Sequence, residues 1–257
     1  MSATAGAARV SVLGVGFDAV SPEEAFSLAC RWLGEGGGLR LVVTANPETV
    51  LKARRLPALG DVINAAALVV ADGVGVVWAA RRLGRPLPGR VAGIELAERL
   101  IEHCSHTGRR VFLLGGRPGS AGRAAVAERA ARVLVQRWQG LRVAGTWHGY
   151  FSQEEEPRVL ETVASSRPAL LLCGMGCPRQ ELWLAQHAGF LEGCGVRVAI
   201  GVGGALDVWS GEVRRAPLFL RRWGLEWLWR LGQDPRRLGR QVQLLRFVME
   251  VLAHGSG

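Results

Sequence analysis

Short apolar runs alternate along most of this chain with longer segments whose apolar residues recur every three or four positions. The runs have the length of single strands and lack the polar alternation of a strand with one face in water. They lie at residues 10–16, 39–44, 68–71, 110–114, 141–146, 169–173 and 196–200. Strands of this kind are typical of sheets that are covered on both faces.

The segments between the runs carry helix signals. Ser21 stands before Pro22 and two glutamates, which is typical of a helix N-terminus. Comparable patterns predict helices at residues 22–32, 47–55, 57–66, 74–83, 94–105, 120–139, 153–165 and 178–188. Alternating strands and helices build parallel sheets. We therefore predict an α/β fold, with a Rossmann-like, mainly parallel sheet and helices on both of its faces.

Three of the apolar runs end in small polar clusters. Thr44 and Asn46 follow the second run, Asp72 follows the third, and the stretch 174–181 (Gly-Met-Gly-Cys-Pro-Arg-Gln-Glu) follows the sixth. The carboxyl ends of parallel strands meet at one edge of the sheet, where open α/β sheets bind their ligands. The sequence thus predicts that these clusters share one site.

The local sequence leaves two interpretations of Asp72 open. A carboxylate beside Gly73 and Gly75, which let a ligand approach the backbone, is well placed as a general base. Aspartate is also a favoured N-cap, and a helix is expected to start near residue 74. Thr44 and Asn46 are open to the same choice between helix capping and ligand binding.

Glycine turns follow several strands and favour an anionic ligand. Backbone N–H groups at the start of the helix that carries Gln180 and Glu181 suit a diphosphate, and Gln180 suits sugar hydroxyls. The glycines that we expect beside the ligand are Gly115, Gly174, Gly176 and Gly203. The turn that contains Gly203 follows the last strand, whereas a dinucleotide fingerprint belongs to the first βα turn, so we interpret it as a nucleotide-proximal loop.

In this order and spacing the clusters closely resemble the WecG/TagA/CpsF family of bacterial glycosyltransferases. The most specific part is residues 173–181, which matches the family stretch Gly-x-Gly-x-Pro-x-Gln-Glu. The resemblance implies that Asp72 activates the acceptor hydroxyl and that Thr44 and Asn46 line the pocket beside it. It also implies that Arg90, in a loop rich in Arg, Pro and Gly, contacts phosphate or the acceptor.

The sequence predicts a reaction without a metal or cofactor. It contains no Asp-x-Asp, so the metal-bridged diphosphate site of many nucleotide-sugar enzymes has no obvious ligands. Charge on a departing diphosphate is then left to helix N-termini and arginines. The five cysteines are scattered and odd in number, which favours a reducing cytosol over a disulfide framework.

The formal charge of +10 is concentrated near the C-terminus, where residues 214–246 hold nine arginines and two acidic residues. Beyond Trp209 the strand pattern stops, and Arg, Trp and Leu dominate. We predict an α/β glycosyltransferase domain at residues 1–208 and a helical, Arg/Trp-rich appendage at residues 209–257.

The appendage ends in an amphipathic helix. Its predicted apolar stripe is Leu238, Val242, Leu245, Met249 and Leu252. Tryptophan and arginine near such a stripe suit a segment that lies on an anionic bilayer, and a helical hairpin packed on the domain is compatible with this. The resemblance implies that tail arginines also complete the site over the diphosphate. The candidates are Arg214, Arg221, Arg222 and Arg230.

No uncharged apolar stretch has the ~18–20 residues that a membrane-spanning helix needs, and residues 1–16 are not organised like a signal peptide. We expect a cytoplasmic protein, peripheral on the inner face of the cell membrane.

Together these features predict an inverting, metal-independent glycosyltransferase. By resemblance it moves an N-acetylhexosamine-type sugar, N-acetylmannosamine or its uronate, from a UDP donor to an undecaprenyl-diphosphate-linked sugar for teichoic acid, capsule or related glycans. One alternative is an NAD-dependent enzyme of nucleotide sugars. Another is a basic nucleic-acid-binding protein, although the arginines alternate with Trp and Leu, and no nucleic-acid-binding motif occurs. Whether the chain forms a homo-oligomer stays open.

Overall fold

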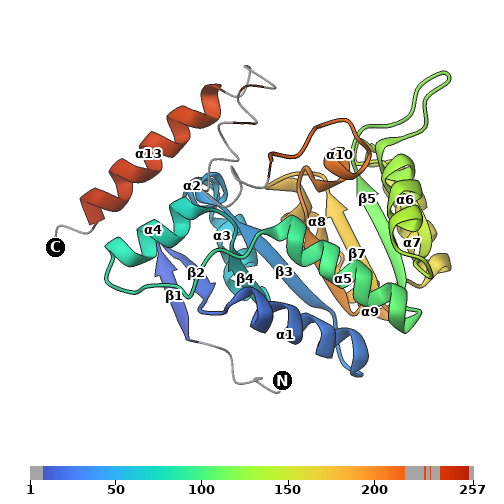
Figure 1. Cartoon of the computed structure of the whole chain (residues 1–257), viewed down its shortest axis with the longest axis horizontal. Helices are drawn as coiled ribbons and strands as arrows, with labels where there is room; N and C mark the ends of the chain where they lie inside the picture. The colour runs from blue at the N-terminus through green and yellow to red at the C-terminus, as the bar shows by residue number, and fades with distance from the viewer. Residues whose placement is uncertain (1–7, 218–228, 230–231, 233–237, 255–257) are drawn as a thin grey trace.

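The computed structural model describes residues 8–217, 229, 232 and 238–254. Its centre is a sheet of six parallel strands (Figure 1). The strands are β3 (Arg40–Ala45), β4 (Leu68–Ala71), β5 (Arg110–Gly115), β6 (Arg142–Trp147), β7 (Leu170–Gly174) and β8 (Val198–Gly201). They lie in the order β4-β3-β8-β7-β5-β6. The predicted α/β fold with a parallel sheet is confirmed.

Helices cover both faces of the sheet, as predicted. One face carries α1 (Pro22–Gly34), α5 (Gly93–Thr107), α6 (Val126–Arg137) and α10 (Ala205–Trp209). The other carries α2 (Pro47–Arg55), α3 (Pro57–Ala65), α4 (Val74–Arg82), α7 (Glu156–Ser166), α8 (Arg179–Gln186) and α9 (Ala188–Gly193). The first helix begins as its sequence predicts, because the Ser21 hydroxyl accepts a hydrogen bond from the Glu24 N–H at 3.2 Å.

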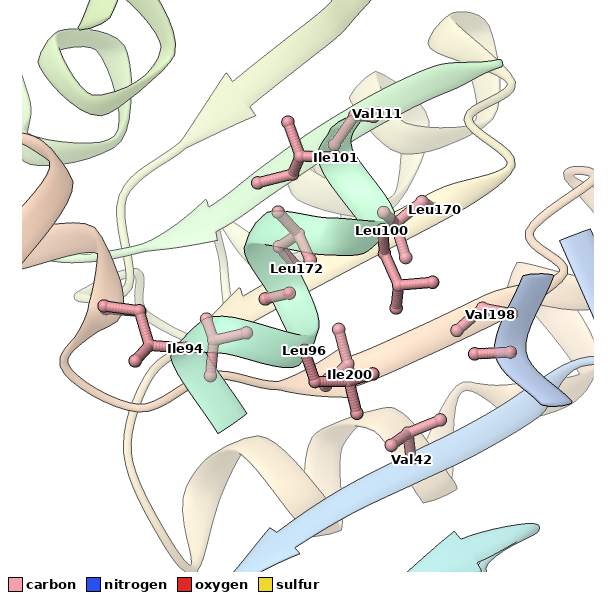
Figure 2. Close-up of a cluster of buried hydrophobic side chains, with 14 of the residues drawn as sticks. Val42, Ile94, Leu96, Leu100, Ile101, Val111, Leu170, Leu172, Val198 and Ile200 are labelled. Atoms are coloured by element: carbon pink, nitrogen blue, oxygen red, sulfur yellow. The ribbon is translucent and has the colours of Figure 1, made fainter. Parts of the chain in front are cut away.

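Successive residues of a strand enter opposite core layers, which explains the uninterrupted apolar runs. In β7, Leu170 and Leu172 pack on the face of α5, whereas Leu171 and Cys173 pack on the face of α7 and α8. Figure 2 shows the first layer, in which α5 crosses the sheet and lays its apolar face on four strands. The labelled side chains of this layer are all buried.

The predicted strand over residues 10–16 is wrong, because this segment is a hairpin. Strands β1 (Arg9–Val12) and β2 (Val15–Asp18) pair with each other, antiparallel and outside the main sheet. Leu13 and Gly14 form the turn, with φ angles of 52° and 89°. Two-residue turns with positive φ match the twist of hairpin strands. The turn was missed because a leucine rarely adopts this conformation.

The predicted helix over residues 120–139 is also too long. Residues 116–125 form a loop, and α6 starts only at Val126. Gly122 has a φ angle of 79°, which a helix that starts at residue 120 does not allow. The short helices α9 and α10 were not predicted, because they have fewer turns than a periodic apolar pattern needs to be visible.

The last helix, α13 (Leu238–His254), lies against α2 and α4 (Figure 1). Phe247 and Val251 have no exposed surface and belong to the same core cluster as Val50 and Ala79. The residues of the predicted stripe that the structure describes point away from this core. They are Val242, Leu245, Met249 and Leu252, with exposed fractions of 66%, 66%, 62% and 42%. The helix thus has a buried apolar face and, opposite it, an exposed apolar stripe.

We expect Phe247→Ala to lower the free energy of unfolding by about 3–5 kcal/mol, because it opens a cavity between α13 and the core. Leu245→Ala on the same helix is the matched control and should change it by less than about 0.5 kcal/mol, because the side chain is exposed. Urea unfolding measures both. Equal, small effects would contradict the docking of α13 on α2 and α4.

Candidate active site

The structure gathers the predicted site residues at the carboxyl edge of the sheet. Each lies at the end of a strand or in the turn or helix that follows it. Residues at this edge are Thr44 and Asn46 after β3, Asp72 after β4, Gly115 at the end of β5, Gly174, Gly176, Gln180 and Glu181 at and after β7, and Gly203 after β8.

The connections of the sheet diverge between β5 and β7. The chain leaves β5 towards β6 and leaves β7 towards β8, in opposite directions. A switch point of this kind opens a crevice where α/β sheets bind ligands. Gly115 and Gly174 meet there, and a Cβ on Gly115 would lie 2.5 Å from the Gly174 carbonyl. Bare backbone therefore lies at this point of the edge, and neither glycine can be replaced by a residue with a side chain.

Gln180 holds the turns after β7 and β8 together. Its Oε1 accepts hydrogen bonds from the N–H groups of Gly176 and Gly203, both at 3.1 Å. Its Nε2 donates to Glu181 Oε1 at 2.7 Å, and the residue is only 4% exposed. Both the oxygen and the nitrogen of the amide are hydrogen-bonded to protein groups, so this side chain positions the two turns.

Glu181 is a buried acid at the base of the site. It is 2% exposed, and its Oε2 has no hydrogen-bond partner in the described structure. Burial raises the pKa of its carboxyl above the ordinary value of 4.5, and the hydrogen bond from Gln180 offsets part of that rise. Lys52, the one lysine of the sequence, lies nearby and donates from Nζ to the Cys177 carbonyl at 2.8 Å. That solitary lysine among arginines was a signal that the sequence analysis passed over.

Asp72 does not occupy the N-cap position of α4. That position belongs to Gly73, whose φ of 144° suits glycine. The Asp72 N–H donates to the Ala45 carbonyl at 2.9 Å, which extends the β3–β4 ladder by one residue. The Asp72 carboxylate lies 3.6 Å from the Arg90 guanidinium, and both side chains keep about a quarter of their surface open, 29% and 23%. The structure thus joins two residues that are 18 positions apart in the sequence.

Thr44 and Asn46 serve the fold at the same edge. The Thr44 hydroxyl donates to the Gly201 carbonyl at 2.9 Å and so ties β3 to β8. Asn46 is the N-cap of α2, where its Oδ1 accepts from the Thr49 N–H at 3.0 Å. The capping interpretation of Asn46 is confirmed. Its Nδ2 donates to no other described residue, and binding of a ligand by that group stays a prediction.

Arginines that the sequence analysis did not single out brace the loops of this edge. Arg179 donates to the Gly149 and Phe151 carbonyls at 2.6 and 2.9 Å, which fixes the loop after β6. Glu212 forms ion pairs with three arginines, which lie in the β5–α6 loop and in α6. They are Arg117 at 3.3 Å, Arg123 at 2.7 Å and Arg129. The hydrogen bond from Arg129 lowers the pKa of the Glu212 carboxyl.

The segment after α10 is thereby fastened on two sides. Glu212 joins it to α6, and Arg215 pairs with Glu95 and Glu98 of α5 at 2.8 and 3.6 Å. Trp209 adds a hydrogen bond from its indole to Glu98 at 3.0 Å. No periodicity in the sequence reveals these pairs, because their partners are about 80 to 120 positions apart.

Of the predicted tail arginines, the structure describes Arg214, whose side chain is exposed and whose carbonyl accepts from the Trp229 indole at 3.2 Å. Arg221, Arg222 and Arg230 lie outside the described residues.

Within the described part of the chain no group of three or more His, Cys, Asp or Glu side chains could hold a metal ion.

An open parallel sheet with glycine turns and an acid–arginine pair at its carboxyl edge is the arrangement of an α/β enzyme that binds its ligand at that edge. The model of the glycosyl transferase WecG/TagA/CpsF family matches residues 10–256, and the chain belongs to that family. The protein is therefore a glycosyltransferase, and the resemblance drawn from the strand-end clusters is confirmed.

Two relatives carry the name N-acetylglucosaminyldiphosphoundecaprenol N-acetyl-beta-D-mannosaminyltransferase. The protein of Bacillus spizizenii strain W23 is 34% identical over 213 residues, which are 83% of this chain and 79% of the relative. The protein of Staphylococcus aureus strain MRSA252 is 35% identical over 247 residues, which are 95% of this chain and 92% of the relative.

The buried acid makes a prediction about pH. Because burial raises the folded-state pKa of Glu181 above its unfolded-state value, the folded protein binds this proton more tightly than the unfolded chain does. Its contribution to stability is then full below the unfolded pKa and is lost as pH rises through the folded pKa. Glu181→Gln removes this titration, so we expect the variant to be at least as stable as the wild type near pH 8.

Urea unfolding from about pH 5 to about pH 8 measures this difference. Glu128→Gln, at a half-exposed position on α6, is the matched control and should leave the pH profile unchanged. A Glu181→Gln variant that is clearly less stable than the wild type near pH 8 would show that Lys52 holds the carboxylate in its charged form.

Proposed function

We propose that this enzyme transfers N-acetylmannosamine from a UDP donor, with inversion, to N-acetylglucosamine carried on undecaprenyl diphosphate. The names of the two relatives support this acceptor and this sugar. The observation that carries the proposal is the Asp72–Arg90 pair, which lies at the same carboxyl edge as the glycine turns. Teichoic acid synthesis, or that of a related surface glycan, is the process such a product would serve.

In the proposed reaction Asp72 is the general base. Its carboxylate takes the proton of the acceptor hydroxyl while that oxygen bonds to the anomeric carbon of the donor. The bond from the anomeric carbon to the diphosphate oxygen breaks on the opposite side, and UDP leaves with the electron pair. Attack opposite to the leaving group inverts the anomeric configuration.

The strand order supports a donor that lies along the edge of the sheet. From β4, which carries Asp72, to β7, which borders the crevice, there are three strand spacings, on the order of 15 Å in all. A nucleotide in the crevice would extend its diphosphate past β8 and β3 and present its sugar near Asp72. Thr44 and Asn46, at the end of β3, would then lie beside the sugar.

The charge of the diphosphate falls mainly to arginines in this proposal. The N–H groups of Gly176 and Gly203 already donate to Gln180, and the Gly116 N–H donates to the Gly174 carbonyl at 3.2 Å. With those backbone donors engaged, guanidinium groups are the remaining source of charge-assisted hydrogen bonds. Arg90 and Arg214 are the described candidates, and Arg221, Arg222 and Arg230 are the further ones predicted from the sequence.

We further propose that the exposed stripe of α13 rests on the membrane that holds the acceptor. The stripe is apolar and lies on a helix that packs on α2 and α4, which begin just after Asn46 and Asp72. It would therefore seat the catalytic edge near the bilayer surface. In this proposal residues 1–208 carry the catalytic base, and residues 209–257 attach the enzyme to the inner face of the membrane and supply further arginines to the site.

Among the described helices, none has both the length and the apolar character needed to cross a bilayer.

The NAD-dependent alternative is less well supported by the geometry. The first βα turn of the sheet, after β3, reads Asn-Pro-Glu and lacks the glycines that bind a dinucleotide. The glycine-rich turn follows β8, the last strand.

Asp72→Asn should lower the rate by about 10²–10⁴-fold while UDP binding stays intact, because only the proton acceptor is lost. UDP release from UDP-N-acetylmannosamine, with a short-chain N-acetylglucosamine diphospholipid as acceptor, measures the rate. Asp61→Asn, at an exposed position on α3, is the matched control and should keep full activity. Retention of more than about a tenth of the rate by Asp72→Asn would place the base elsewhere.

Replacing Val242, Leu245 and Met249 together by serine should weaken co-sedimentation with anionic liposomes by about tenfold or more, because the apolar surface that enters the bilayer is lost. Activity on a water-soluble acceptor should not change. Val133→Ser with Val135→Ser, at exposed positions on α6, is the control and should sediment like the wild type. Unchanged sedimentation of the triple variant would refute the membrane role of α13.

A further inference from the structure

A second basic site lies at the opposite edge of the sheet, where the amino ends of β5, β6, β7 and β8 meet the ends of the preceding helices (Figure 1). A hollow of about 550 Å³ opens there. Five arginines line it together with Gly108, Ala169, Cys194 and Gly195. The arginines are Arg109, Arg110, Arg142, Arg167 and Arg197. The residues that line the hollow include no acid, and this edge is separate from the catalytic one.

The arginines of this hollow are held close together by the sheet. Arg110 and Arg142 are direct partners in the parallel register of β5 and β6, where like charges destabilise a pair of strands. The guanidinium carbon of Arg142 lies over the turn after α5, 3.9 Å from where a Cβ on Gly108 would stand. Arg167 reaches the hollow from a left-handed backbone conformation, with φ of 44°.

The protein neutralises little of this charge. Within the described part of the chain none of the five guanidinium groups forms an ion pair. Arg197 donates one hydrogen bond, to the Gly37 carbonyl. The C-terminal ends of α5, α6, α7 and α9 point to this edge and supply a partial charge of up to roughly −0.5 each. Four helix ends offset at most about two of the five positive charges, so about three remain.

We propose that this hollow binds a small polyanion of the diphosphate or polyphosphate class, independently of the transferase site. Guanidinium groups bind phosphate oxygens through paired, charge-assisted hydrogen bonds, and several of them around one hollow match a ligand with several negative charges. The volume is in the range of small-molecule sites, about 300–1,000 Å³, which favours a compact ligand over an extended polymer. Binding there would also relieve the repulsion between Arg110 and Arg142.

Inorganic pyrophosphate is the probe that tests the proposal. Calorimetric titration and the thermal midpoint of unfolding should both show that pyrophosphate binds the wild-type chain, and binding should weaken with added salt. The variant R110Q/R142Q should bind it at least about tenfold more weakly. Without pyrophosphate, at low salt, this variant should unfold at the same or a higher temperature than the wild type, because the repulsion is gone.

Two further variants make the result specific. R132Q/R158Q removes two exposed arginines from α6 and α7 and should bind pyrophosphate like the wild type. R90Q removes a guanidinium that we propose for diphosphate binding at the catalytic edge, and it should leave intact the binding that R110Q/R142Q weakens. Equal affinity of R110Q/R142Q and wild type, loss of all binding in R90Q, or no binding by the wild type would each overturn the proposal. Loss of adhesion to anionic vesicles in R110Q/R142Q, with pyrophosphate binding unchanged, would overturn it in favour of a membrane-facing surface.

Discussion

The catalytic edge depends on one buried amide. Gln180 bonds to the turns after β7 and β8 at the same time, and no side chain fits between it and the sheet, since a Cβ on Gly201 would lie 2.6 Å from its Nε2. This sets the spacing of the glycine turns beside the crevice. It also engages their N–H groups, which is why we propose that phosphate binding at this edge falls mainly to arginines.

The described segments that follow the sheet are tied back to it. The segment after α10 is fastened through Glu212 to α6 and through Arg215 to α5. The last helix then returns to the catalytic side, where Phe247 and Val251 complete the core beneath α2 and α4. The described parts of residues 209–257 are therefore anchored to α5 and α6 at one end and to α2 and α4 at the other. The exposed stripe of α13 is held in a fixed orientation towards the lipid-linked acceptor that we propose.

Local patterns predicted most of the secondary structure, because they are set by residues close in sequence. Ser21 capping α1, Asn46 capping α2 and the apolar run of β4 each depend on neighbours within four positions. The prediction failed where a local rule was broken, as at Leu13, a leucine with positive φ, or where a glycine with positive φ, Gly122, lay inside the predicted helix. It also failed for α9 and α10, which are too short to show a period.

The sequence by itself determined the class of fold, the edge of the sheet that carries Thr44, Asn46, Asp72 and the glycine turns, and membership of the glycosyltransferase family. Tertiary structure decided what these residues contact: Arg90 beside Asp72, Gln180 turned inward, and the predicted stripe of α13 left exposed while its other face is buried. It also placed Arg110 beside Arg142. Helix and strand periods report which side of an element is apolar. Only the packing of elements distant in sequence decides which charged side chains come into contact and which apolar faces are buried.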